Sequence, residues 1–166
     1  MLIDSHSHLN FPDAFPDLAA VKHSMGEAGV EAAVVVGTGI ESSRRAKELA
    51  CAWMFPTAGI LPNETSFTDT APEWRDLEAL TSDKACVAVG ETGLDGHHKD
   101  VPFETQKVRF SRHLALARER GLPVIVHSRQ AGEETRFMLR AEGRGLMGVL
   151  HCFDGHEGLA REALDL

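Results

Sequence analysis

The sequence predicts an α/β protein of the TIM-type (β/α)₈ barrel class, with about six β/α units in its 166 residues. Apolar strands alternate with amphipathic helices, and successive strand ends lie at intervals close to the ~31 residues per unit of such a barrel. Polar, ligand-type side chains also follow several of these strands, at the end where barrel enzymes build their active sites. A doubly wound open sheet shares the alternation, but its glycine-rich loop after the first strand is replaced here by residues 9–12.

The first half of the chain supplies three of the units. Apolar residues at positions 18, 21, 25 and 28 predict one helical face, and Gly29 is suited to end that helix. A nearly continuous apolar run over 31–36 is typical of a strand buried on both faces. Thr70 and Glu73 have the spacing of a capping box. The elements expected here are a strand ending near His8, a helix over 18–28, a strand over 31–36, a helix from about 41, a strand over 54–60 and a helix after Thr70.

The second half continues the pattern. Gly121 is suited to stop one helix, and Gly143 and Gly145 break the next. The elements expected here are a strand over 85–89 ending at Gly90 and Glu91, a helix over 102–120, a strand over 123–126, a helix over 131–142, a strand over 148–150 and a helix through 159–164. We therefore expect residues 1–166 to be a single barrel domain, truncated before its last two β/α units.

Composition limits the possible functions. Net charge is −8 and the pI is near 5.5, so a nucleic-acid partner would not be held by a broad basic surface. No apolar run is long enough to span a membrane, and no signal peptide is evident, so we expect a cytoplasmic protein without a membrane partner. Cys51, Cys86 and Cys152 form no metal or disulfide pattern, and we expect reduced thiols in the core.

His6 and His8 suggest half of a metal site. Side chains two apart on a strand point the same way, and their Cα atoms lie about 6.6 Å apart. Two imidazoles at that separation can bind one ion, although an isolated His-x-His pair also occurs on solvated strand ends.

Three later strands each deliver a further ligand-type residue, namely Glu91, His127 and His151. Four imidazoles and one carboxylate suit two divalent cations, because a carboxylate can bridge both ions while the histidines divide between them. Such a pair of ions generates hydroxide near neutral pH and neutralises charge on the electrophile, which gives Glu91 a catalytic role. The ions could be Zn, Mg, Mn, Ni or Fe. Each residue alone also has a structural explanation, as a buried histidine or a loop cap.

Several further residues are weaker candidates for the active site. Arg129 should face the same way as His127, where a guanidinium suits phosphate, although a salt bridge would explain it equally well. Asp95 could orient a ligand histidine as a hydrogen-bond acceptor, or could be a surface acid. Among the other histidines, His23 and His113 are expected on the surface or behind the site. His97, His98 and His156 fall in loops at the active end, where they could touch substrate, although solvated loop positions are the first explanation for them.

Four segments resemble the signatures of the TatD-like metal-dependent deoxyribonucleases, a family of the amidohydrolase-type barrel superfamily. They are residues 3–9 (IDSHSHL), 90–95 (GETGLD), 122–129 (LPVIVHSR) and 150–155 (LHCFDG). The resemblance implies that His6, His8, Glu91, His127 and His151 bind metal, with Glu91 bridging. It also implies hydrolysis of phosphodiester bonds in DNA.

The chain departs from the family pattern in two places. Leu61 and Asn63 occupy positions that are usually histidines, and the family's last ligand, an aspartate after the eighth strand, has no counterpart. These departures leave open a weakly active or inactive metal-binding module. A metal-dependent hydrolase of amides, esters or lactones is a further alternative, because the same hydroxide attacks carbonyl groups equally well. No obligate protein partner is implied, but self-association is expected if the barrel is incomplete.

Overall fold

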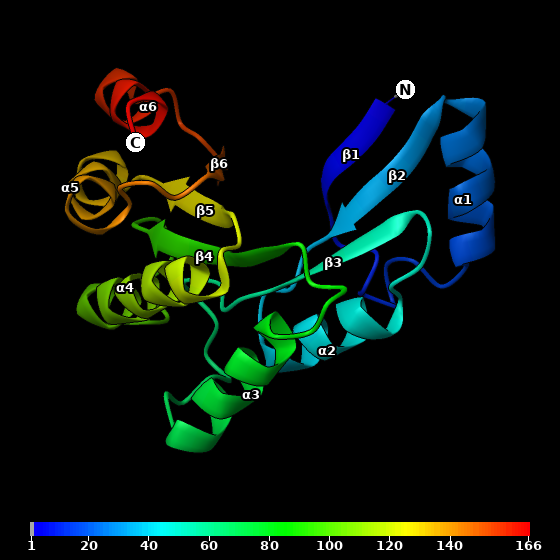
Figure 1. The fold of residues 1–166 in the computed structure, drawn as a ribbon, viewed down its shortest axis with the longest axis horizontal. Helices are drawn as coiled ribbons and strands as arrows, with labels where there is room; N and C mark the ends of the chain where they lie inside the picture. The colour runs from blue at the N-terminus through cyan, green and yellow to red at the C-terminus, as the bar shows by residue number, and fades with distance from the viewer. Residues whose placement is uncertain (1) are drawn as a thin grey trace.

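The computed structural model describes residues 2–166, and Met1 lies outside the described part. Within that range, strands and helices alternate strictly along the chain (Figure 1). The strands are β1 (Leu2–Ser7), β2 (Val30–Val35), β3 (Met54–Ala58), β4 (Ala88–Asp95), β5 (Val124–Arg129) and β6 (Gly148–His151). The helices are α1 (Leu18–Glu27), α2 (Ile40–Glu48), α3 (Ala71–Thr81), α4 (Phe103–Arg120), α5 (Gly132–Glu142) and α6 (Glu157–Leu164).

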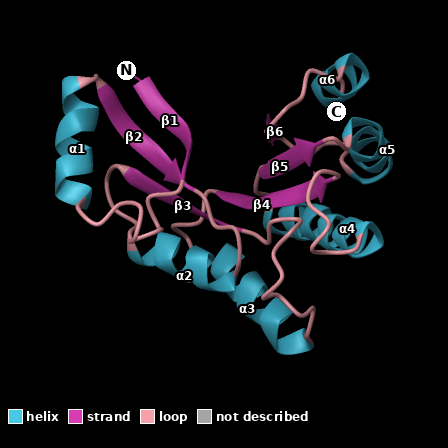
Figure 2. Cartoon of the chain, turned by 180° about the vertical axis from the view of Figure 1, so that it is seen from behind, coloured by secondary structure: helices cyan, strands magenta, loops and turns pink. Residues whose placement is uncertain are grey.

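All strand pairings are parallel, and the sheet follows the order of the sequence from β1 to β6. Figure 2 shows that the sheet curls, so that β1 and β2 face β5 and β6 across an open interior while the helices lie outside. This arrangement is the curved wall of a (β/α)₈ barrel with the expected six units in place. Strands β1 and β6 are the two edges of the sheet.

The largest hydrophobic core lies between α3, α4 and the strands β4 and β5. Phe110 and Leu114 of α4 and Leu77 of α3 are fully buried there, because they fall on the apolar faces of their helices. A smaller core around Val35 joins β2 to α1 and α2. Both cores lie outside the sheet, which leaves the carboxyl ends of the strands for polar side chains.

Helix α3 begins as the capping-box pattern predicts. Thr70 is its N-cap, and its backbone N–H and its hydroxyl donate to the Glu73 carboxylate at 3.0 and 2.7 Å. These bonds lower the pKa of Glu73 to about 2, with the Thr70 hydroxyl as the largest cause.

The prediction for β4 was wrong in extent. The strand begins at Ala88 and continues through Glu91 to Asp95, instead of ending at Glu91. Gly93 permits this continuation, because it has φ of 132° and a Cβ atom there would lie 2.2 Å from the His127 carbonyl oxygen. A register shift between Val89 and Thr92 accompanies it. Glu91 therefore lies within the strand and Asp95 lies at its end.

The expectation of core thiols holds for Cys86 only. Cys51 and Cys152 are exposed. Strand β6 ends at His151, so the alternation of strand faces does not reach Cys152, which has φ of 54°. No disulfide forms among residues 2–166, and none of the helices there has the length and apolar character to cross a membrane.

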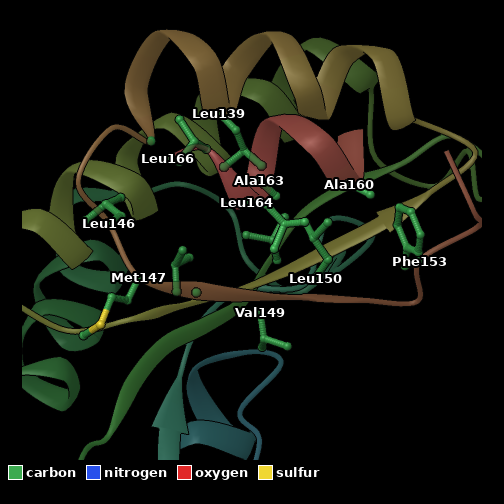
Figure 3. Close-up of a pocket in the computed structure, with 14 residues that line it drawn as sticks. Leu139, Leu146, Met147, Val149, Leu150, Phe153, Ala160, Ala163, Leu164 and Leu166 are labelled. Atoms are coloured by element: carbon green, nitrogen blue, oxygen red, sulfur yellow. The ribbon is translucent and has the colours of Figure 1, made fainter. Parts of the chain in front are cut away.

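An apolar groove of about 380 Å³ opens between β6, α5 and α6 (Figure 3). Leu146, Leu150 and Phe153 line it, together with Ala160 and Leu164 of α6. Its lining includes no ionisable side chain, which separates it chemically from the polar strand ends.

Candidate metal centre

Five ligand-type side chains converge on the side of the sheet toward which four strands run, from positions within the strands or at their carboxyl ends. His6 lies on β1 and His8 directly follows it, while Glu91, His127 and His151 come from β4, β5 and β6. Parallel strands that curl bring their carboxyl ends toward one another, so residues distant in the sequence meet there. The sequence predicted this grouping from the strand ends.

Glu91 is the centre of the group. Its Oε1 atom lies 2.7 Å from His127 Nδ1 and 3.8 Å from His151 Nε2, and its Oε2 atom lies 3.2 Å from His6 Nε2. The carboxylate is 2% exposed, and its two oxygens face different histidines. That is the arrangement a bridging carboxylate requires.

His6, His8 and Glu91 offer ligand atoms that all lie within 4.8 Å of one another. The His8 ring donates from Nδ1 to the Val36 carbonyl at 3.3 Å, which leaves Nε2 free to bind. Neither ring nitrogen of His6 has a hydrogen-bond partner among residues 2–166, although both are buried, because the 3.2 Å approach to Glu91 lacks hydrogen-bond geometry. Two buried nitrogens without partners and a nearby carboxylate fit a divalent cation.

The charges of the cluster depend on one another. Burial by itself would raise the pKa of Glu91, but contacts with His127 and His6 outweigh it and lower that pKa to about 2. Burial would lower the pKa of His127, but the carboxylates of Glu91 and Asp95 raise it. For His151, burial and the neighbouring imidazoles lower the pKa. The cluster therefore keeps an ionised carboxylate among partly buried imidazoles.

Backbone contacts to β3 and to the end of β2 hold Glu91 in place. The Thr57 hydroxyl donates to the Gly90 carbonyl at 2.5 Å, and the Glu91 N–H donates to the Gly37 carbonyl at 2.8 Å. Gly59 packs so closely that a Cβ atom would lie 2.5 Å from Gly90. A glycine at position 59, just after β3, is therefore a condition for the position of the carboxylate.

Asp95 contacts His127 from the side opposite Glu91. Its Oδ2 atom lies 3.1 Å from His127 Nε2 and 2.8 Å from His98 Nδ1. Burial would raise the pKa of Asp95, but the His98 ring, the amides of His97 and His98 and the His127 ring lower it to about 2. The predicted contact between Asp95 and a candidate ligand is present, and His98 is a second partner.

Gln106 holds the backbone of Asp95 in place, and the sequence analysis did not identify it. The buried Gln106 amide accepts from the Asp95 N–H at 2.8 Å and donates to the Asp95 carbonyl at 3.2 Å. A glutamine on the apolar face of a helix is the signal that could have revealed it, because a buried amide needs partners.

The remaining candidates form no hydrogen bond or ion pair with the five ligand-type side chains within residues 2–166. Arg129 is half-buried at the end of β5 opposite Asp95 in register, and its guanidinium forms no ion pair within the described chain. Leu61 and Asn63 are half-buried in the loop after β3. His156 caps α6 by accepting from the Leu159 N–H at 3.0 Å and pairs with Glu133 at 2.8 Å, so its contacts are structural.

His113 lies fully inside the core. Its Nε2 atom accepts from the Ile60 N–H at 3.1 Å, and its Nδ1 atom donates to the Arg109 carbonyl at 2.7 Å. Arg109 donates to the carbonyls of Glu64 and Phe67 at 2.8 and 2.5 Å and pairs with Asp69 at 2.7 Å. Together these two α4 residues hold the loop that follows β3.

Comparison with known proteins gives a consistent result. A family model described as TatD related DNase matches residues 3–166. An uncharacterized metal-dependent hydrolase, YabD of Bacillus subtilis, is 35% identical over 170 residues. A 3'-5' ssDNA/RNA exonuclease TatD of Musicola paradisiaca is 37% identical over 154 residues. The chain is covered to 100% and 90% in these matches, and spans 66% and 56% of those relatives.

Among solved structures, the crystal structure of YJJV, a TatD homolog from Escherichia coli, superimposes with a TM-score of 0.89 at 29% identity. The match covers 99% of this chain and 64% of that one. A hydrolase TatD family protein from Entamoeba histolytica has the same fold, with a TM-score of 0.82 at 22% identity.

Proposed function

This chain belongs to the family of TatD-related DNases, and on that premise we propose that it hydrolyses phosphodiester bonds in DNA with the help of divalent cations. The observation that carries the proposal is the convergence of four histidines on the buried carboxylate of Glu91.

The proposed ligands are His6, His8, Glu91, His127 and His151, for one or two divalent cations. Glu91 would bridge, since its two oxygens face different imidazoles. Such cations supply positive charge that polarises a phosphoryl group and lowers the pKa of a water molecule.

The side chains of the chain have separate roles in this proposal. Glu91 stays ionised at neutral pH, because its pKa is near 2. Asp95 orients the His127 ring, and Gln106 holds Asp95. Arg129 contributes a guanidinium that would position a substrate phosphate at the end of β5.

Single-stranded DNA or RNA is the substrate class we infer first. The relative from Musicola paradisiaca carries that specificity in its name. The net charge of −8 also disfavours a long duplex held by many phosphate contacts. A strand end, bound locally at the cluster, needs fewer such contacts.

The test is an incubation of the purified protein with end-labelled single-stranded DNA, duplex DNA and RNA, each with Mg²⁺, Mn²⁺, Zn²⁺ or EDTA. We expect cleavage that requires a cation and is lost in Glu91→Gln but kept in His23→Ala. His23 is an exposed histidine on α1 and serves as the matched control. Absence of cleavage with every cation, or equal cleavage by Glu91→Gln, would contradict the proposal.

A metal-dependent hydrolase of amides, esters or lactones is the second candidate. The acidic charge of the chain favours it, since such substrates need no attraction for phosphate. Including chromogenic esters, lactones and amides beside a phosphodiester separates the two candidates. Turnover of a carbonyl substrate without cleavage of any phosphodiester would select the second.

A further inference from the structure

A hollow of about 320 Å³ adjoins the candidate metal centre at the carboxyl ends of β4 and β5. The loop between β4 and α4 forms one wall with His98 and Lys99. The first turn of α4 forms a second wall with Phe103. The third wall consists of Gln130 and Glu134, which follow β5. The hollow and the cluster share Asp95, whose Oδ2 atom contacts both His98 and His127.

The walls of the hollow are fixed by hydrogen bonds. The Asp95 Oδ1 atom accepts from the backbone N–H groups of His97 and His98 at 2.8 and 2.9 Å, which sets the loop. Gln106 donates to the Val101 carbonyl at 3.1 Å, and the Gly96 N–H donates to the Arg129 carbonyl at 2.8 Å. A hollow built this way exists before any ligand arrives.

The chemistry of the walls suits a flat, neutral ring with polar edges. The His98 imidazole is held by Asp95, and the His97 ring packs nearly perpendicular to it with centroids 4.9 Å apart. The His98 side chain is still 38% exposed, which leaves part of its surface open for stacking. Phe103 and Val101 add apolar surface, while Gln130 and Glu134 offer polar groups. Histidine and aromatic side chains are common stacking partners of unpaired bases.

The charged side chains that line the hollow favour a nucleobase over a phosphate. The lining carries two carboxylates, Asp95 and Glu134, and one ammonium group, Lys99, whose Nζ already donates to the Gly96 carbonyl, so its net charge does not favour a phosphate. The exposed carboxylate of Glu134 can accept hydrogen bonds from ring or amino N–H groups, which all nucleobases present. The oxygens of the buried Asp95 are already engaged by His97, His98 and His127. The volume also lies at the low end of small-ligand pockets, which is enough for one base.

We propose that this hollow is a base-binding pocket that takes the nucleobase beside the phosphate held at the metal centre. The inference rests on the proposed nuclease function, because it names the part of the substrate that the adjoining surface recognises. His98 is then a residue that determines substrate affinity, and Gln130 contacts the edge of the base.

Binding can be measured without turnover. The purified protein in Mg²⁺ or Zn²⁺ is titrated with deoxyadenosine, deoxycytidine and thymidine 5'-monophosphates, which contain no phosphodiester bond, and with 2-deoxyribose 5-phosphate, while ¹H–¹⁵N and histidine ring ¹H–¹³C NMR spectra are recorded. We expect the nucleotides to shift the signals of His98 and Gln130, and to bind roughly tenfold more tightly than the base-free sugar phosphate.

Two alanine variants test whether the nucleotides bind in this hollow. His98→Ala and Gln130→Ala should weaken nucleotide binding by roughly fivefold to tenfold without changing the binding of the sugar phosphate. His98→Phe, which keeps a flat ring, should retain most of the affinity. His23→Ala is the matched control. Gln130 is exposed, so its variant tests the pocket even if His98→Ala disturbs the loop.

Two results would overturn the inference: equal binding of nucleotides and sugar phosphate, or unchanged nucleotide affinity in both alanine variants. The cleavage assay tells this failure apart from failure of the proposed function. Cation-dependent cleavage without base binding would refute the pocket alone, whereas base binding without cleavage would refute the nuclease alone.

Discussion

The imidazole rings of His6 and His151 stack with centroids 3.5 Å apart and planes within 4° of parallel, although their strands are opposite edges of the sheet. Only a sheet curled into a barrel wall brings those edges together at one end. Two imidazoles packed face to face beside a carboxylate are available as ligands for the same ion or for neighbouring ions.

We therefore expect His6→Ala and His127→Ala each to weaken binding of Zn²⁺ or Mn²⁺, because they contribute to one cluster from different strands. The loss should reach at least the roughly 10- to 100-fold that removal of an outer-shell partner costs. Elemental analysis and competition with a chromophoric chelator measure it, with His23→Ala as control. Unchanged stoichiometry and affinity in both variants would refute the cluster.

Glu91→Gln and Arg129→Ala should change different kinetic parameters. Loss of the central negative charge should lower kcat by roughly 10³-fold, whereas loss of the guanidinium should mainly raise KM, by roughly tenfold. Steady-state kinetics on a single-stranded oligonucleotide with the preferred cation separates the two parameters. Equal losses in kcat at unchanged KM would show that Arg129 is misassigned.

His113 should make stability depend on pH. Burial, the largest cause, lowers its pKa from 6.5 to about 4, so the folded protein keeps it neutral where the unfolded chain already binds a proton. Stability should fall as pH decreases from about 6.5 to about 4, by up to about 1.4 kcal/mol per pH unit. Urea denaturation across this range measures it.

The variant His113→Gln should flatten that part of the profile, because glutamine does not titrate. His23→Gln, at an exposed position, should leave the profile unchanged. If His113→Gln and the unaltered protein have parallel profiles, the buried imidazole is not the titrating group.

The exposed apolar surface near β6 should promote self-association of the 166-residue chain. Val149 is 48% exposed on this edge strand and Met147 is 75% exposed beside it. Sedimentation velocity should show an average mass that rises over a roughly hundredfold range of concentration, and Val149→Lys should reduce that rise. Val108→Lys is the control, since Val108 is exposed on α4 away from the edge. A monomer at all concentrations would contradict this prediction.

The sequence predicted the barrel wall and the grouping of His6, Glu91 and His151 because both depend on strand and helix periodicity. It did not predict the length of β4. Gly90 and Gly93 resemble the start of a loop, but they are the residues whose lack of a side chain lets β4 approach β5. That approach depends on the neighbouring strand, which lies more than thirty residues away in the sequence.

The buried polar residues of α4 were harder to predict for a related reason. His113 was expected on the surface or behind the site, and its true partner, the Ile60 amide, lies 53 residues away. The position of His113 beside Leu114, on the face that also carries Gln106 and Phe110, was the available sign of its burial. Helical periodicity can place such a residue in the core, but it cannot name the backbone group that satisfies it.

Helix α4 contacts two separate parts of the molecule, the end of β4 and the loop after β3. Gln106 holds Asp95 at the end of β4, while Arg109 and His113 hold the loop after β3. All three side chains project from one continuous helix. Local unfolding of its middle turns would therefore release the end of β4 and the loop after β3 together. The amides of Asp95 and Ile60 should therefore exchange with solvent deuterium at a common rate, as members of one cooperative unit.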